Sequence, residues 1–195
     1  MRRTPHVIGL VVAALLIAGC TLPTDDSAQV LTGPEIDNVM NPTTTSTTSA
    51  VETRDRELFL FDDDDLLAPS VVAVPHDADI AAILNLLAPS DDRSMRTAVP
   101  DGFVVSTTEL SSSGVLTVVL ADDTLFAQVG GDQLPQAVGQ IVVTATELDD
   151  VDVRGVRFAI DGEPPQPRQV PTGDGVNTDG PVTRCDYRQF LPAPC

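Results

Sequence analysis

The chain has 195 residues, of which 42% are hydrophobic, and its formal net charge is −18 at pH 7. This length fits one folded domain with flanking segments. The 29 acidic residues far outnumber the 11 basic ones, so the surface lacks the positive charge that phosphate contacts need, which excludes nucleic acid as a partner. There is no tryptophan and only one tyrosine, so the core must be mainly aliphatic.

The N-terminal residues have the pattern of a bacterial export signal. Arg2 and Arg3 precede an uncharged apolar stretch, residues 7–18, which is shorter than the roughly 20 residues that a membrane-spanning helix needs. Residues 17–20, of sequence IAGC, place small side chains before Cys20 and resemble the lipobox of bacterial lipoproteins. We therefore predict a signal peptide over residues 1–19 and a lipid anchor, including palmitate, on Cys20.

Residues 20–56 predict a disordered tether. They contain several prolines and the run TTTSTTS at residues 43–49, with little apolar clustering. A flexible segment of this length reaches roughly 35 Å. A spacer that lifts a domain off the membrane is the favoured interpretation, and O-glycosylation of the Thr/Ser run stays open.

Residues 57–170 carry the hydrophobic patterns of a folded domain. Runs of apolar and β-branched residues predict strands at residues 58–61, 70–74, 103–110, 115–120 and 156–160. Four aspartates at residues 62–65 lie in the turn between the first two strands. Residues 111–114, of sequence SSSG, predict a hairpin between the third and fourth strands.

Two helices are predicted between these strands. The first has Asp77 as its N-cap and ends after Ala88, because Pro89 cannot continue it. The second has Asp132 as its N-cap. Their apolar faces consist of Ile80, Ile83, Leu84 and Leu87, and of Leu134, Val138, Ile141, Val142, Ala145 and Leu148. This order of elements predicts an α+β fold, in which two helices pack on one face of a mostly antiparallel sheet.

Several segments resemble GerMN domains in their order and spacing. They are residues 86–89 (LLAP), 96–102 (RTAVPDG), 115–120 (VLTVVL) and 156–164 (VRFAIDGEP), together with a long helix from Gln133. Residues 180–187 (GPVTRCDY) are similar to the ends of actinobacterial GerMN lipoproteins. The chain departs from the pattern at Ala88, where glycine is usual, and at residues 121–126. The resemblance implies a non-catalytic envelope module, associated with sporulation and germination assemblies.

Two cysteines lie near the C-terminus. Cys185 and Cys195 are the only thiols left once Cys20 is lipidated, and a location outside the membrane permits oxidation. We predict a disulfide between them that closes the C-terminal tail, residues 171–195. A free pair remains the alternative, because the sequence does not establish the Cα separation that a disulfide needs.

Other reactive residues do not form a convincing site. His76 lies beside Asp77 with Ser70 upstream, but adjacent residues at a helix start do not predict the geometry of a catalytic triad. The cysteines lack a second ligand pair at zinc spacing. Residues 62–65 offer oxygen ligands for calcium, yet their spacing matches no calcium loop, so a solvated turn is favoured. We predict no catalytic residue, metal or cofactor.

The leading functional hypothesis is therefore a non-enzymatic module, anchored outside the cell membrane, that contacts an envelope protein or the cell wall. Its sheet edges, its Pro-rich residues 164–167 and its acidic surface are the available contact features. The alternative is a lipoprotein that binds a solute or a cation, and a hydrolase is the weakest candidate. A ligand-sized cleft would favour the alternative, and an exposed apolar patch would favour the leading hypothesis.

Overall fold

The computed structural model describes residues 52–91, 93–162 and 164–195, which belong to one compact unit. The signal peptide, Cys20 and nearly all of the predicted tether lie outside the described residues. Among the described residues, none of the helices has the length and hydrophobicity needed to span a membrane.

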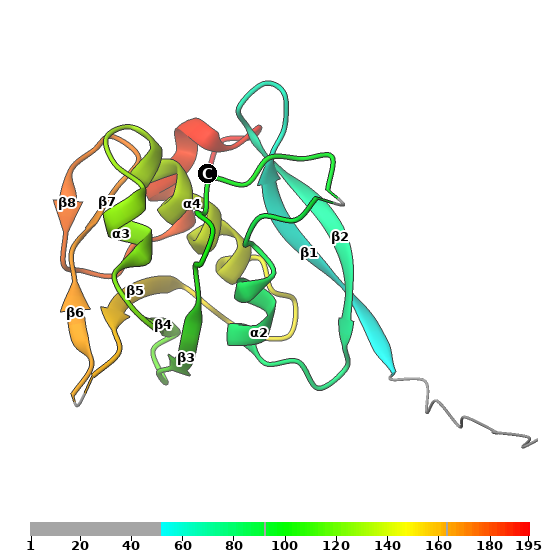
Figure 1. The fold of residues 1–195 in the computed structure, drawn as a ribbon, viewed down its shortest axis with the longest axis horizontal. Coiled ribbons are helices and arrows are strands. Elements are labelled where there is room, and N and C mark those ends of the chain that lie inside the picture. Colours follow the sequence, from blue (N-terminus) through cyan, green and yellow to red (C-terminus); the bar gives the residue numbers. More distant parts are fainter. Residues whose placement is uncertain (1–51, 92, 163) are drawn as a thin grey trace, which may run out of the picture. The chain divides into compact units, whose positions relative to one another are not determined.

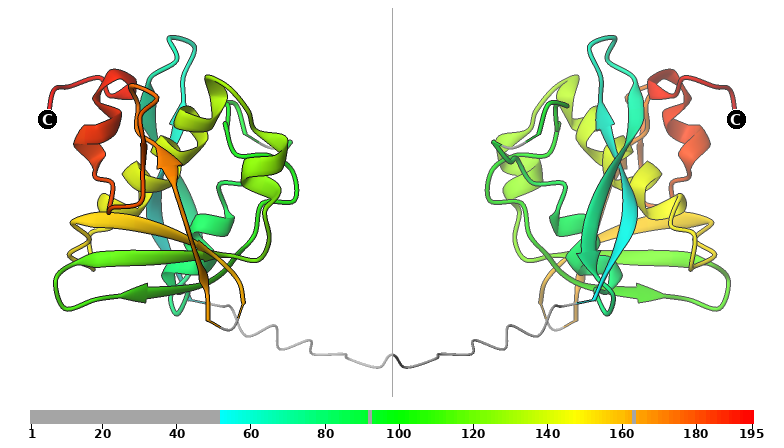
Figure 2. Two further views of the ribbon diagram at one scale, coloured as in Figure 1. Left: turned by 90° about the vertical axis from the view of Figure 1, so that its left-hand side faces the viewer. Right: turned by 90° about the vertical axis from the view of Figure 1, so that its right-hand side faces the viewer.

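A four-stranded mixed sheet forms the base of the fold (Figures 1 and 2). Its strands, in spatial order, are β3 (Val105–Leu110), β4 (Val115–Leu120), β5 (Gly155–Ile160) and β6 (Gln166–Arg168). Neighbours pair antiparallel except β4 and β5, which are parallel and are connected through helices. Gly114 closes the predicted β3–β4 turn with a φ of 80°, a conformation that glycine adopts at low cost.

Helix α4 (Gln133–Thr146) is the centre of the core. It packs against β5, and also against β1 and the C-terminal helix, so side chains are buried around most of its circumference. Its β-branched residues have modest helix propensity, and burial stabilises the helix instead. The predicted apolar face is buried, apart from the half-buried Leu134. Asp132 precedes the helix as predicted, but its side chain makes no capping hydrogen bond.

Strands β1 (Thr53–Phe61) and β2 (Leu67–Pro75) form a separate antiparallel hairpin that packs on α4 (Figure 1). The buried Thr144 hydroxyl of α4 accepts a hydrogen bond from the backbone N–H of Phe59 at 3.1 Å. Strand β1 begins before the predicted domain boundary at residue 57. Residues 53–56, which were assigned to the tether, are therefore part of the fold.

Helix α2 (Ile80–Asn85) covers β3 and touches α4. Asp79 is its N-cap and accepts from the N–H of Ala82 at 2.7 Å, so the prediction of Asp77 as the cap was wrong by two residues. The helix also ends at Asn85, before the predicted Ala88, and continues as turns toward Pro89. A short helix that the sequence did not indicate, α3 (Thr124–Gln128), precedes α4.

The segment predicted to be a tail also folds. It contains β7 (Val170–Pro171), β8 (Asn177–Thr178) and the 3₁₀ helix η1 (Arg184–Phe190), which packs on α4. The capping box between Thr183 and Asp186 starts η1, and Tyr187 inserts into the core. Residues 171–195 thus complete the hydrophobic core instead of trailing from it.

The α+β prediction is confirmed. Helices α2 and α4 lie on the same face of the four-stranded sheet, as expected (Figure 2). The sequence pattern did not show that the first two strands would form their own sheet against α4, or that β4 and β5 would pair in parallel.

Candidate binding site

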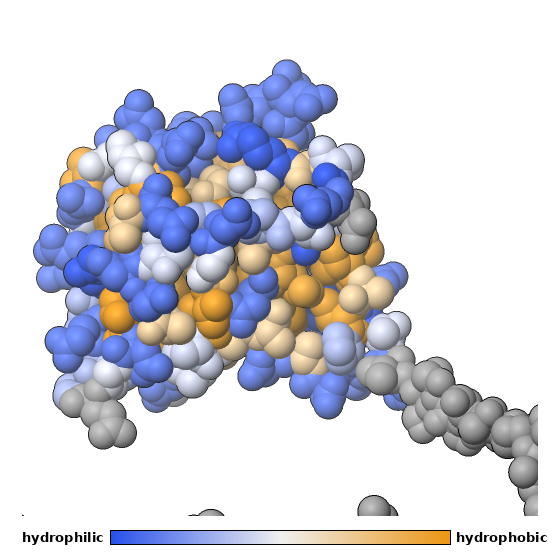
Figure 3. Space-filling model, in the orientation of Figure 1, coloured by the Kyte–Doolittle hydropathy of each residue, from blue (hydrophilic) through white to orange (hydrophobic). Residues whose placement is uncertain are grey.

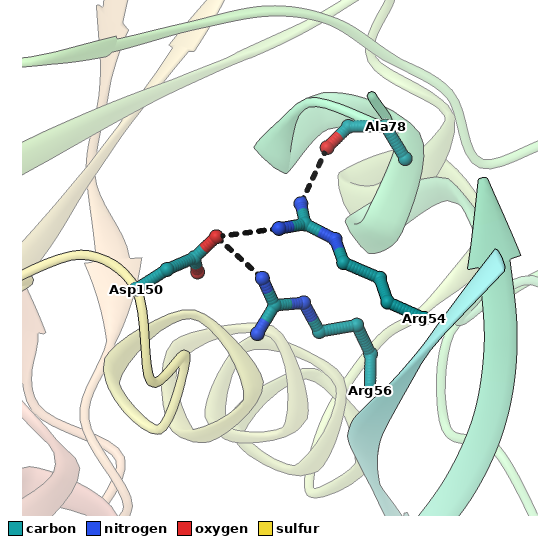
Figure 4. Close-up of polar contacts among 4 residues, drawn as sticks. All are labelled: Arg54, Arg56, Ala78 and Asp150. Carbon is teal, nitrogen blue, oxygen red and sulfur yellow. Dashed lines mark hydrogen bonds and ion pairs between the residues drawn. The ribbon is translucent and has the colours of Figure 1, made fainter. Parts of the chain in front are cut away.

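Two arginines of β1 converge on one carboxylate in the loop after α4 (Figure 4). Arg54 Nη1 donates to Asp150 Oδ2 at 2.9 Å, and Arg56 Nη2 donates to the same oxygen. Arg54 Nη2 also donates to the carbonyl of Ala78 at 3.1 Å. Side chains alternate along a strand, so both arginines lie on the face that carries the buried Leu58. The cluster therefore connects the hairpin to the loop that contains Asp150 and to the loop that contains Ala78.

The cluster has an excess of one positive charge, since two guanidinium groups share one carboxylate. The Arg56 side chain is only 9% exposed, whereas that of Asp150 is 43% exposed. A buried charge is costly unless it is paired, so Arg56 depends most on this contact. Within the described part of the chain, the Nε atoms of Arg54 and Arg56 are buried without a hydrogen-bond partner.

A groove of about 540 Å³ opens beside this cluster. Arg54 and Asp150 form one side of it, and α2 and β3 form the others. Its apolar lining comes from Ile80, Ile83, Leu110 and Val151, and its hydroxyl groups come from Ser106, Thr107 and Thr108. Apolar walls with a few polar groups are typical of small-molecule sites. The guanidinium of Arg54 is paired with Asp150, and Asp79 adds a second carboxylate to the lining, so the groove has no net positive charge.

Strand β2 presents a second candidate surface. Its residues Pro69, Val71, Ala73 and Pro75 are exposed, and Val71 is 63% exposed. The whole strand, of sequence LAPSVVAVP, has no charged residue. In Figure 3, hydrophobic surface gathers over the region of β2 and α2, and hydrophilic residues surround it. An exposed, uncharged edge strand pairs readily with another chain.

The predicted site residues fall in different places. Cys20 lies outside the described residues. Cys185 and Cys195 are exposed free thiols near the C-terminus. A hydrogen bond with the Cys185 side chain raises the pKa of the Cys195 thiol. The disulfide between them stays a prediction.

The residues considered for a catalytic triad do not assemble. His76 is exposed directly after β2, and its backbone N–H donates to Glu52 at 2.8 Å. Ser70 lies six residues earlier on the same extended strand, which corresponds to roughly 20 Å at about 3.3 Å per residue. His76 and Ser70 therefore cannot share a proton.

The aspartate turn is organised by its own side chains. Asp62 Oδ1 accepts from the N–H groups of Asp64 at 3.0 Å and Leu66 at 2.9 Å, and Asp65 pairs with Arg96. Within residues 52–91, 93–162 and 164–195, no group of three or more His, Cys, Asp or Glu residues is arranged to hold a metal ion. The carboxylates of Asp62 and Asp65 thus stabilise the loop between β1 and β2.

Sequence reasoning missed the arginine cluster because it placed Arg54 and Arg56 in the tether. The signal was present, since basic and acidic residues alternate from Arg54 to Glu57. Alternation of charge with period 2 indicates a strand with one basic and one acidic face. Asp150 carried no comparable signal, because only the fold brings it to β1.

The fold is an α+β domain in which a hairpin, a mixed sheet and a C-terminal segment enclose a central helix. The family model described as "Germane: Sporulation and spore germination" matches residues 57–166, more than half of the chain. The chain therefore belongs to the Germane family, and the expectation of a GerMN-type domain is confirmed.

Two solved structures are similar in fold. The tandem GerMN domains of the sporulation protein GerM from Bacillus subtilis match with 17% identity and a TM-score of 0.56, over 69% of this chain and 48% of that chain. The first GerMN domain of the same protein matches with 18% identity and a TM-score of 0.54, over 68% of this chain and 98% of that chain. The match thus spans about half of the tandem structure and nearly all of the single domain. No curated protein matches the chain.

Proposed function

We propose that this chain is a non-catalytic, lipid-anchored module of the cell envelope whose GerMN-type domain binds another envelope protein. The main support for the proposal is that strand β2 is an exposed, uncharged edge in a chain with a net charge of −18. Surface apolar residues in such an acidic protein favour contact with a protein surface. Membership of a family described by sporulation and spore germination supports a place in envelope assemblies.

The N-terminal arrangement supports the anchoring part of the proposal. A signal peptide, a lipidated Cys20 and a tether ending near Thr53 would hold the domain outside the cell membrane, within reach of membrane proteins. In this arrangement the lipid restricts the domain to a thin layer and so raises its effective concentration near a membrane-bound partner.

Chemical crosslinking in living cells tests both parts together. The wild-type chain should give a discrete crosslinked adduct that mass spectrometry identifies as an envelope protein. Cys20→Ala should release the folded domain from the membrane fraction and weaken that adduct. Unprocessed Met1 without lipid in the membrane fraction would contradict the anchor, and an unchanged adduct from Cys20→Ala would show that the anchor contributes nothing to binding.

A second candidate function is the binding of a small solute or a cation in the groove beside Arg54. The groove volume of about 540 Å³ and its apolar walls with a few hydroxyl groups support this candidate. Isothermal titration with small dicarboxylates, inorganic phosphate and calcium ions tests it, with Arg54→Ala as the binding-site variant. The exposed Arg157 of β5 provides a matched control, Arg157→Ala, because it lies outside the groove. Absence of heat with the wild-type protein would remove this candidate.

A further inference from the structure

The hydrogen-bonding pattern of the hairpin shows which edge of β2 is free. In an antiparallel pair, successive residues point their backbone groups alternately toward the partner strand and away from it. Just before β1, the carbonyl of Glu52 accepts from His76 at 2.8 Å, in register with the hairpin. Phe61, by contrast, is odd-numbered. Its backbone N–H and C=O groups bond to Arg96, at 2.8 and 3.0 Å, and not to β2. Even-numbered residues of β1 therefore bond to β2.

The continuous register carries this alternation onto β2. Even-numbered residues of β1 lie opposite even-numbered residues of β2, so the even-numbered residues of β2 bond to β1. The odd-numbered Val71 and Ala73 therefore direct their N–H and C=O groups away from the hairpin. Among the described residues these groups have no hydrogen-bond partner, and β2 has β1 as its one neighbouring strand. Pro69 and Pro75 bound the free stretch, since neither can donate.

Acidic side chains lie near β2, on the neighbouring strand β1 and just after the C-terminal end of β2. Glu57 lies opposite Val71 and Asp55 lies opposite Ala73, and both acids are exposed on the same face as these two residues. Asp77 follows the strand and is exposed as well. A neutral, hydrogen-bonding centre with a charged rim is the usual anatomy of a protein interface.

An apolar hollow of about 390 Å³ adjoins the C-terminal end of β2. Val74, Ala82 and Leu86 supply apolar lining, and Asp77 and Asp79 supply carboxylates. A strand laid along β2 would reach this hollow with its last residues. The hollow suits an apolar side chain that is followed by a positive charge.

We propose that β2 binds an extended segment of a partner protein by strand addition, and that this segment has apolar residues at its centre and Lys or Arg at its flanks. The inference rests on the proposed function, because it names the partner class of the same surface. Backbone hydrogen bonds to Val71 and Ala73 align the segment, and the carboxylates of Asp77 and Asp79 favour basic residues at its end. A second copy of the chain fits less well, since its β2 has no basic residue to pair with Asp77 and Asp79.

A designed peptide serves as the probe. It has alternating valine and threonine in its centre and two lysines at each end, and binding to the purified full-length protein is followed by amide hydrogen exchange. The amides of Val71 and Ala73 should become protected, and affinity should fall as salt rises. The same peptide with glutamate flanks, or with N-methyl groups on the edge facing β2, should not bind. Protection of both amides in the free protein would overturn the proposal, because the edge would already be paired.

Paired variants separate backbone from side-chain effects. Val71→Pro removes an outward N–H without touching the bonds to β1 and should weaken binding about tenfold or more. Val71→Thr keeps the N–H and should bind within about threefold of the wild type. Equal affinity of Val71→Pro and Val71→Thr would contradict strand addition. Circular dichroism establishes that each variant remains folded.

Further outcomes distinguish this inference from the proposed function. If the peptide does not bind but the full-length chain still crosslinks to an envelope protein in cells, strand addition is wrong and the binding module stands. If sedimentation shows that the wild-type chain is a dimer and that the Val71→Pro variant is a monomer, a second copy of the chain occupies β2. The proposal of a partner segment with basic flanks is then wrong. If neither peptide nor cellular crosslink is found, both proposals fail.

Discussion

The ring of Tyr187 lies directly against the backbone of Gly139 in the middle of α4. A Cβ atom at residue 139 would lie 2.8 Å from Tyr187 Cδ1 and 3.0 Å from its Cγ. The tyrosine is fully buried, and its hydroxyl donates to the carbonyl of Pro171 at 2.9 Å. This contact makes the C-terminal segment an integral part of the domain.

Gly139→Ala should therefore destabilise the protein. Alanine favours a helix over glycine by about 0.5–1 kcal/mol, but the clash with a buried ring should outweigh this and give a net loss of about 1–3 kcal/mol. Urea unfolding measures the change. Gly130→Ala is the matched control, because a Cβ there meets no atom within 4 Å. A more stable Gly139→Ala protein would contradict the contact.

Ionisation of Tyr187 should accompany alkaline unfolding. Burial, with a smaller effect of the Asp186 charge, raises the pKa of Tyr187 above its usual value. Above about pH 10 the unfolded chain loses this proton while the folded protein keeps it, so the free energy of unfolding falls as the pH rises.

Because the chain has one tyrosine and no tryptophan, tyrosinate absorbance reports Tyr187 alone. The absorbance change should coincide with loss of the circular dichroism signal. Ionisation at the usual pKa, while the protein is still folded, would show that the ring is not buried.

Asp150→Asn should destabilise the hairpin contact with the core. The change leaves the mostly buried Arg56 without its carboxylate, and because Asp150 is itself partly exposed we expect a loss of about 1–2 kcal/mol. Asp152→Asn is the matched control, since Asp152 and Arg154 are both largely exposed, and it should leave the free energy of unfolding nearly unchanged. Equal losses in the two variants would mean that Arg56 does not depend on Asp150.

The C-terminal cysteines should be oxidised in the protein purified from the cell envelope. Reduction should then add the mass of two hydrogen atoms, and the bridge should contribute up to about 3 kcal/mol if it is unstrained. Cys185→Ser and Cys195→Ser should each lower the unfolding midpoint by a similar amount. An unchanged intact mass on reduction would establish a free pair.

The sequence predicted most elements because their side chains alternate or repeat with clear periods. The core faces of α2 and α4 and the strands β3, β4 and β5 are examples. The start of β1 was missed because its charged residues resemble a solvated tether, and their pairing partner Asp150 lies 94 to 96 residues away. Residues 171–195 were missed because separate buried side chains, those of Val182, Tyr187 and Leu191, anchor them without a periodic pattern. The free edge of β2 depends on strand pairing, which local patterns do not specify.

Site-specific photocrosslinking in living cells shows whether β2 is the surface that contacts a partner protein. A photoreactive amino acid replaces Val71 on β2, Thr107 in the groove or Arg157 on β5, each in the full-length chain. We expect a discrete protein adduct from residue 71 and none from residue 157, with the residue 71 adduct lost when Ala73→Pro is added. Adducts from residue 107 or residue 157 alone, with none from residue 71, would contradict binding through β2.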